Sequence, residues 1–173
     1  MKNVFKALGI ITVLILIFPS CTYKLSLNGA SIPANMKTIR VEFFENNAAL
    51  VVNNLSTTFT EALKDRIRNT TRLSVVRGDA DAVMSGSITD YNIAPASVAA
   101  TSGNTVPLAN ANRLTITVHV KYVSDVDKKD NFDQSFSKFE NFQGDINSQE
   151  QTLITDITKQ LTEDIFNQAF ANW

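Results

Sequence analysis

The sequence contains one cysteine, one histidine and no strong excess of either charge. A single cysteine cannot form an internal disulfide, so packing alone must stabilise the fold. One histidine and one cysteine are too few for a His/Cys zinc site. The formal net charge of −1 excludes a general nucleic-acid binder, which would be strongly basic. There is also no glycine-rich phosphate-binding loop. We therefore expect no metal, no cofactor and no nucleic-acid partner.

Patterns typical of catalysis are absent as well. His119 falls on the polar side of a predicted strand, which is typical of a solvated side chain rather than a catalyst or ligand. Ser85-Gly86-Ser87 lacks the two glycines that flank a nucleophilic serine. The acidic stretches 79–81 and 125–130 lack the glycine and closing glutamate of a calcium loop. We interpret the chain as a binding or assembly protein and not as an enzyme.

What is present begins with a secretory signal. Lys2 and Lys6 precede an unbroken apolar run from Leu8 to Phe18, which ends at Pro19-Ser20-Cys21. A positive segment, a short apolar segment and a small residue, in this order, are typical of a signal peptide. The run is short for a membrane-spanning helix, which needs about 20 apolar residues. We predict that residues 1–20 are a signal peptide.

Residues Phe18-Pro19-Ser20-Cys21 resemble the lipobox of bacterial lipoproteins, in which the cysteine is acylated and the signal is cut before it. Ser20 fits that pattern, whereas Phe18 and Pro19 depart from the commonest form, Leu-Ala-Gly-Cys. A signal peptide with an incidental cysteine and an N-terminal membrane anchor are the alternatives. We predict that Cys21 is the lipid attachment site, because two or three acyl chains anchor a protein stably. Thr22 stands where an aspartate would retain a lipoprotein in the inner membrane, which favours the outer membrane.

Two segments have the periodicity of amphipathic helices. Residues 53–69 and 147–170 each place apolar side chains along one stripe. We expect Asn53 or Asn54 to cap the first helix, and Ser148 and Gln151 to form a capping box at the second. The stripe residues are Leu55, Phe59, Ala62, Leu63 and Ile67 in the first helix, and Leu153, Ile157, Leu161, Ile165 and Ala169 in the second.

Four segments read as strands and residues 73–76 as a short β-prone run. Residues 113–123 alternate most regularly between apolar and polar side chains. A phase change within residues 82–93 predicts a bulge near Gly86 or Asp90. Phe139 is out of phase with Phe132 and Phe136, which suggests a bulge in the last strand as well. The predicted strands are 38–44, 82–93, 113–123 and 132–142.

Residues 95–112 contain almost no large side chains and predict a long hairpin loop. The resulting order of elements is β-α-β-β-β-α. It predicts an α+β domain over residues 37–173, with two helices on one face of a four- to five-stranded, mostly antiparallel sheet. Residues 21–36 would form the lipidated tether that precedes this domain.

Several motifs in order along nearly the whole chain resemble the LPS-assembly lipoprotein (LptE-like) family, in the form found in Bacteroides-type bacteria. They are Leu55-x-x-x-Phe59-Thr60-Glu61-Ala62-Leu63-x-Asp65-Arg66, Ala80-Asp81 followed by Gly86-x-Ile88-x-x-Tyr91, Asn112-Arg113-Leu114-Thr115-Ile116-x-Val118, Phe132-x-Gln134-Ser135-Phe136-Ser137 and Asp164-Ile165-Phe166-Asn167-x-Ala169-x-Ala171-Asn172-Trp173.

The resemblance implies two helices on one face of a sheet, inside the lumen of the large outer-membrane β-barrel that inserts lipopolysaccharide. Such a protein helps the barrel assemble, plugs it and binds lipopolysaccharide. The phosphates of that ligand favour Arg or Lys near a strand end or loop. Arg113 and Lys138 are the candidates, and solvated cations are the alternative for each. A lipoprotein subunit or ligand-binding module of another envelope complex is the alternative function, with residues 95–112 as a docking loop.

Overall fold

The computed structural model describes residues 32–171, except for residues 51, 53 and 97–110. The signal peptide, Cys21, most of the tether and most of the predicted loop 95–112 lie outside the described residues. The elements are β1 (Thr38–Val41), β2 (Glu45–Asn46), α2 (Leu55–Thr70), β3 (Ser74–Val76), β4 (Ala82–Pro95), β5 (Ala111–Ser124), β6 (Phe132–Gln143) and α3 (Glu150–Phe170).

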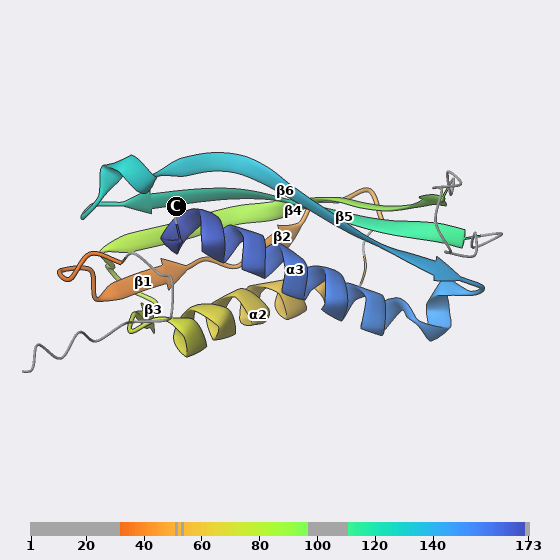
Figure 1. The fold of residues 1–173 in the computed structure, drawn as a ribbon, viewed down its shortest axis with the longest axis horizontal. Coiled ribbons are helices and arrows are strands. Elements are labelled where there is room, and N and C mark those ends of the chain that lie inside the picture. Colours follow the sequence, from red (N-terminus) through yellow and green to blue (C-terminus); the bar gives the residue numbers. More distant parts are fainter. Residues whose placement is uncertain (1–31, 51, 53, 97–110, 172–173) are drawn as a thin grey trace, which may run out of the picture.

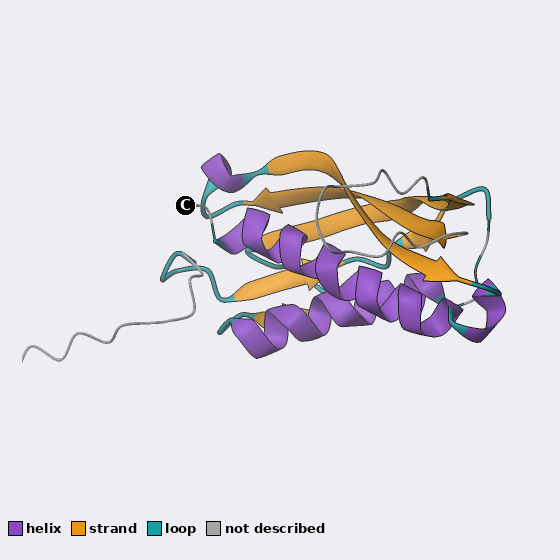
Figure 2. Ribbon diagram, turned by 45° about the vertical axis from the view of Figure 1, so that its right-hand side comes forward, coloured by secondary structure: helices purple, strands orange, loops and turns teal. Residues whose placement is uncertain are grey.

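The strands form one six-stranded sheet in the order β3-β1-β4-β5-β6, and β2 pairs with β4 beyond the end of β1. The pairings of β1 with β3, β1 with β4 and β2 with β4 are parallel and short. The pairings of β4 with β5 and β5 with β6 are antiparallel and long. Both helices lie on the same face of this sheet (Figures 1 and 2). The predicted α+β class is confirmed, with a more mixed sheet than we expected.

The core lies between the two helices and the inward face of the sheet. The α2 stripe is buried at Leu55, Phe59, Leu63 and Ile67, and the α3 stripe is buried along its whole length. Each buried aliphatic side chain contributes roughly 1.5–3 kcal/mol to stability. The predicted inward face of β5 is confirmed, because all five of its alternate apolar residues are buried: Leu114, Ile116, Val118, Val120 and Tyr122.

The first predicted strand, residues 38–44, is shorter than we expected: β1 ends at Val41, residues 42–44 belong to no strand, and β2 follows at Glu45–Asn46. At this break the backbone N–H of Phe44 donates to the Oγ1 of Thr60 in α2, at 3.1 Å, and the bond is buried. The Phe44 ring packs against Phe59 with its centroid 5.1 Å away. The chain therefore turns from the sheet toward the helix at Phe44.

One of the two predicted bulges exists. The β4–β5 register shifts between Ile88 and Asp90, which reverses the phase of β4 and buries both Ile88 and Tyr91. The bulge suggested in the last strand was wrong, because the β5–β6 register is continuous from Phe132 to Gln143. Phe139 is out of phase for a simpler reason: it lies on the outward face, where its side chain is 47% exposed.

The side-chain caps predicted at Asn54 and at Ser148 and Gln151 were wrong, and Asn53 lies outside the described residues. Asn54 does precede α2, but in a left-handed conformation, and its side chain makes no capping bond to any described residue. Helix α3 begins after Gln149, since a short 3₁₀ turn at Ile146–Ser148 precedes it. The Ser148 hydroxyl donates to the carbonyl oxygen of Asp145 instead of joining a capping box. In the first turn of α3, Oε1 of Glu150 accepts a hydrogen bond from the hydroxyl of Tyr91 at 2.8 Å.

Candidate interaction surfaces

The outward face of β4, β5 and β6 is covered by no helix of the described part (Figure 2). We call it the open sheet face. Register and alternation place mostly hydroxyl, amide and charged side chains on it. Its members are Ser85, Ser87, Asp90 and Asn92 of β4, Arg113, Thr115, Thr117, His119 and Lys121 of β5, and Asp133, Ser135, Ser137, Phe139 and Asn141 of β6.

His119 lies at the centre of hydrogen bonds that cross this face. Its Nε2 lies 2.7 Å from Oδ1 of Asp133, and its Nδ1 lies 3.3 Å from the hydroxyl of Ser135. Both partners come from β6, two residues apart, and the His119 side chain is 43% exposed. The prediction that His119 is a surface residue on the polar side of a strand is confirmed. Its contacts join β5 to β6 across a solvated sheet.

Arg113 also lies on the open sheet face. Its Nε donates to Oδ1 of Asn141 at 3.0 Å, and its guanidinium lies 3.8 Å from the centre of the Phe139 ring. A guanidinium over an aromatic face is attracted by the ring's quadrupole. Phe139 therefore positions the Arg113 side chain near the start of β5, with its charge at the surface.

Lys138 lies on the opposite face of the sheet. It pairs in register with the buried Ile116, so both side chains point toward the helices. Its Nζ lies 2.7 Å from Oδ2 of Asp164 in α3. Arg113 and Lys138 therefore cannot contact the same phosphate. The sequence already indicates this separation. Lys138 lies two residues from Phe136 and so shares its inward face, whereas Arg113 precedes the inward-facing Leu114 and so points outward. A role in ligand binding stays a prediction for each residue.

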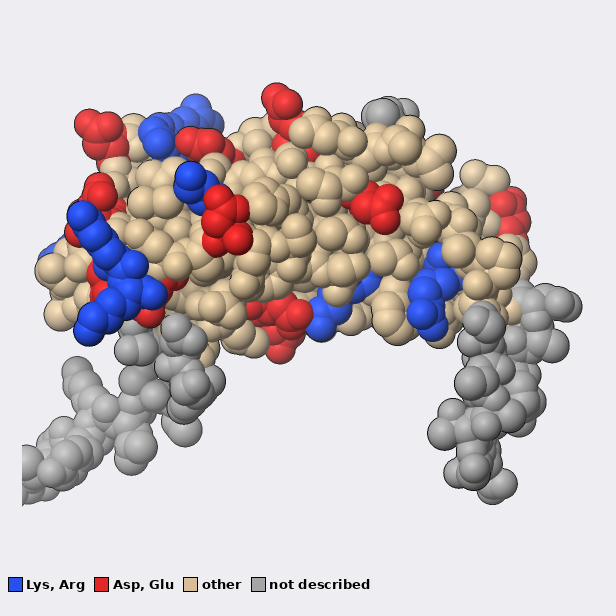
Figure 3. Space-filling model, turned by 90° about the horizontal axis from the view of Figure 1, so that it is seen from above, with Lys and Arg blue, Asp and Glu red and all other residues tan. Residues whose placement is uncertain are grey.

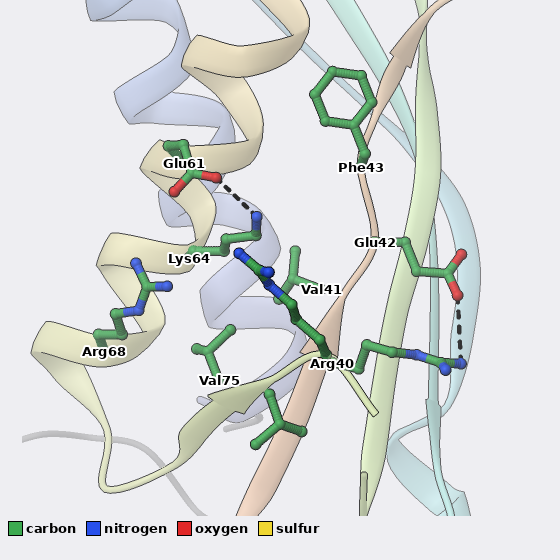
Figure 4. A pocket seen from close by; sticks show the side chains of 10 residues that line it. Arg40, Val41, Glu42, Phe43, Glu61, Lys64, Arg68 and Val75 are labelled. Carbon is green, nitrogen blue, oxygen red and sulfur yellow. Dashed lines mark hydrogen bonds and ion pairs between the residues drawn. The ribbon is translucent and has the colours of Figure 1, made fainter. Parts of the chain in front are cut away.

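Two cavities border helix α2. One of about 430 Å³ lies between α2 and α3 and is lined by Arg66 and Lys159 together with threonine side chains. There Arg66 donates to the carbonyl oxygen of Lys159 at 3.4 Å and lies 3.6 Å from Glu163. Its charge is therefore partly balanced within the helix pair. The other cavity, of about 480 Å³, lies between α2 and strands β1 and β3 (Figure 4). Neither cavity could be predicted from the pattern of apolar and polar residues in the sequence.

On the face shown in Figure 3, the charged side chains do not form a large field of one sign. Figure 3 shows Lys and Arg interspersed with Asp and Glu, with much of that surface carrying neither. Within the described residues, no group of three or more His, Cys, Asp or Glu side chains is placed to hold a metal ion. No helix in the same residues is both long and apolar enough to cross a membrane.

Comparisons with known proteins show the family of the chain from its sequence and its fold from the structure. The family model LptE, described as lipopolysaccharide-assembly, matches residues 36–169. A hypothetical protein of Chlamydia trachomatis has a similar structure, with a TM-score of 0.54 and 8% identity over 79% of this chain and 99% of that chain. A protein of Xanthomonas campestris gives a TM-score of 0.51 and 9% identity over 76% of this chain and 81% of that one. At such identities these structures show the fold alone.

A third solved structure is rare lipoprotein B of Shewanella oneidensis, with a TM-score of 0.47 and 9% identity over 76% of this chain and 92% of that one. No curated protein gives a significant match to the sequence.

Proposed function

The chain belongs to the lipopolysaccharide-assembly family LptE, and we propose on this basis that it plugs an outer-membrane β-barrel. The barrel would be the translocon that inserts lipopolysaccharide into the outer membrane, and the chain would help it assemble and function. The observation that carries the proposal is the family match over residues 36–169, which includes every strand and nearly all of α3. The protein would act by binding and not by catalysis.

The open sheet face supports a place inside a barrel. The lumen of an outer-membrane barrel is polar, so a plug needs polar groups that can hydrogen-bond to it. The open sheet face presents such groups on three adjacent strands, including the bonded pair Thr117 and Ser137. The helices supply the other side of the domain, where polar residues of α2 and α3 alternate with the buried stripes.

We propose that Cys21 carries the lipid anchor and holds the domain at the periplasmic side of the outer membrane. The change Cys21→Ser should leave an uncut or soluble form, because the acyl chains would have no attachment site. Fractionation of cells and the migration of the protein on a gel measure both effects. A Cys21→Ser protein that is still membrane-bound and of normal size would refute the anchor.

We also propose Arg113 and Lys138 as separate contacts to lipopolysaccharide, since they lie on opposite faces. Arg113 is the better placed, because its charge is held at the surface beside Phe139. Lys138 would first have to leave Asp164. Arg113→Gln should therefore weaken lipopolysaccharide binding by the purified protein more than Lys138→Gln does. Equal binding by Arg113→Gln and the unmodified protein would remove Arg113 from the proposal.

Affinity purification from detergent-solubilised outer membranes tests the function. A tagged copy of the chain should recover one large β-barrel protein, and depletion of the chain should lower surface lipopolysaccharide. Recovery of other envelope proteins without a large barrel, and unchanged surface lipopolysaccharide after depletion, would instead favour a subunit or ligand-binding module of another envelope complex.

A further inference from the structure

The cavity between α2 and strands β1 and β3 arises from the shortness of an edge strand. Strand β3 has three residues and ends at Val76, opposite Arg40 of β1. Beyond this point the chain continues through Val41, Glu42 and Phe43, while α2 with its 16 residues continues alongside. The space that a longer β3 would fill is left as a cavity of about 480 Å³ (Figure 4).

The lining of this cavity carries more positive than negative charge. Arg40, Lys64, Arg68 and Arg77 border it, against the carboxylates of Glu42 and Glu61, and Arg40 is paired with Glu42 at 3.4 Å. Figure 4 shows Glu61, Lys64 and Arg68 on the turns of α2 that face β1 and β3. A surplus of cations in a concave site favours a ligand with more than one negative charge.

The cations differ in how firmly they are already paired. Lys64 lies 2.8 Å from Glu61 and Arg68 lies 3.0 Å from Asp65, both as neighbours along α2. Such exposed helix pairs are weak and can be replaced by a stronger anion. Arg77 is exposed and makes no hydrogen bond or ion pair in the described part of the chain. Its guanidinium is therefore available to hold two oxygens of a phosphate at once.

An apolar side chain stands beside these cations. Phe43 lines the same cavity and is 56% exposed, the largest exposed fraction among the large apolar side chains described. Val41 and Val75 add further apolar lining, and Val41 is buried. Exposed phenyl groups at the edge of a charged cavity suit a ligand with an apolar part next to its charge.

The path of the chain places this cavity on the side where the tether enters the domain. Arg72, just before β3, donates to the carbonyl oxygens of Ile32 and Pro33 at 3.1 and 3.3 Å. The stretch from Cys21 to Ile32 can span at most roughly 40 Å. If Cys21 is acylated, Ile32 and its partner Arg72 stay within roughly 40 Å of the membrane surface, where amphiphiles with phosphate groups are concentrated.

We propose that this cavity binds the phosphate of an amphiphile, with Arg77, Lys64 and Arg68 around the phosphate and Phe43 against the adjoining hydrocarbon. A phospholipid and a lipopolysaccharide both carry this chemistry. The site uses none of the residues of the open sheet face and needs no barrel partner. A cavity that binds no amphiphile would therefore not contradict the proposed barrel function. A purification that recovers no barrel would likewise not contradict this binding site.

Binding of short-chain dioctanoyl phosphatidic acid to the full-length protein in nonionic detergent tests the site. Arg77→Gln should weaken this binding about tenfold, as expected for the loss of one charge-assisted contact. Lys129→Gln is the matched control, because it removes the same charge from an exposed turn between β5 and β6 and should change the affinity less than twofold. Equal affinities for Arg77→Gln and the unmodified protein would overturn the proposal.

The two halves of the ligand are tested separately. Phe43→Ser should weaken binding of dioctanoyl phosphatidic acid several-fold and leave binding of inorganic phosphate unchanged. Dioctanoyl glycerol, which lacks the phosphate, should not compete with the phosphatidic acid. Competition by lipopolysaccharide would identify it as a source of the phosphate, and competition by phosphatidylglycerol alone would identify phospholipid. Equal competition by dioctanoyl glycerol, or no effect of Phe43→Ser, would contradict the proposed ligand.

Discussion

The hydrogen bond between Phe44 and Thr60 explains the break between β1 and β2, and a methyl substitution tests this explanation. Thr60 is fully buried in α2, and its Oγ1 accepts the buried backbone N–H of Phe44 at 3.1 Å. Thr60→Val keeps the shape of the side chain and leaves that N–H without an acceptor. An unsatisfied buried donor costs about 1–3 kcal/mol. We expect the free energy of unfolding to fall by about this amount.

Thr158 in α3 provides the control. It is also buried, but its Oγ1 has no hydrogen-bond partner among the described residues. Thr158→Val therefore removes a buried hydroxyl that makes no hydrogen bond in the folded state. We expect the free energy of unfolding to stay the same or to rise. Urea unfolding followed by circular dichroism measures both variants, and an unchanged m value would show that only stability differs. Equal destabilisation of the two variants would refute this reading of the Phe44 contact.

Three further predictions concern single contacts. Asp81 accepts two backbone amides and a hydroxyl at the start of β1, which lowers the pKa of its carboxyl below the ordinary 3.8. Its stabilisation is therefore present above pH 4 and lost as pH falls through the lowered pKa, and acid unfolding of Asp81→Asn should lack this dependence. Gly86→Ala should destabilise the protein by about 1–3 kcal/mol in urea unfolding, because a Cβ there collides with the carbonyl oxygen of His119. Burial and the bond to Glu150 raise the pKa of the Tyr91 hydroxyl. Tyr91→Phe should therefore cost about 1 kcal/mol at neutral pH in the same assay and remove a loss of stability that begins above pH 10.

The elements with strong periodicity were predictable from the sequence. Strand β5 alternates without exception from Leu114 to Tyr122, and each helix carries a continuous apolar stripe. In these elements the local pattern and the tertiary packing require the same residues on the same face. The bulge in β4 was predictable too, because burying both Ile88 and Tyr91 requires an extra residue between them.

The wrong predictions arose where contacts between distant residues decide the local structure. The first predicted strand ends early where Phe44 bonds to Thr60, which lies 16 residues further along the chain. At the start of α3 a second distant pair, Tyr91 and Glu150, is joined by a hydrogen bond that the local sequence did not indicate. Such pairs have no signal in a single sequence.

The candidate sites divide in the same way. Alternation alone could have placed Arg113 and Lys138 on opposite faces, since their strands were correctly identified. The cavity around Arg77 could not be predicted, because it depends on how far the three-residue β3 extends beside β1 and α2.

The central claim is that the domain sits inside a barrel, and photo-cross-linking in living cells tests it most directly. A photoreactive amino acid at Ser137 reports on the open sheet face, and one at Asp156 reports on the exposed side of α3. A plug is surrounded, so both positions should cross-link to the same β-barrel protein. Cross-links to a barrel from one position only, or from neither, would contradict the claim.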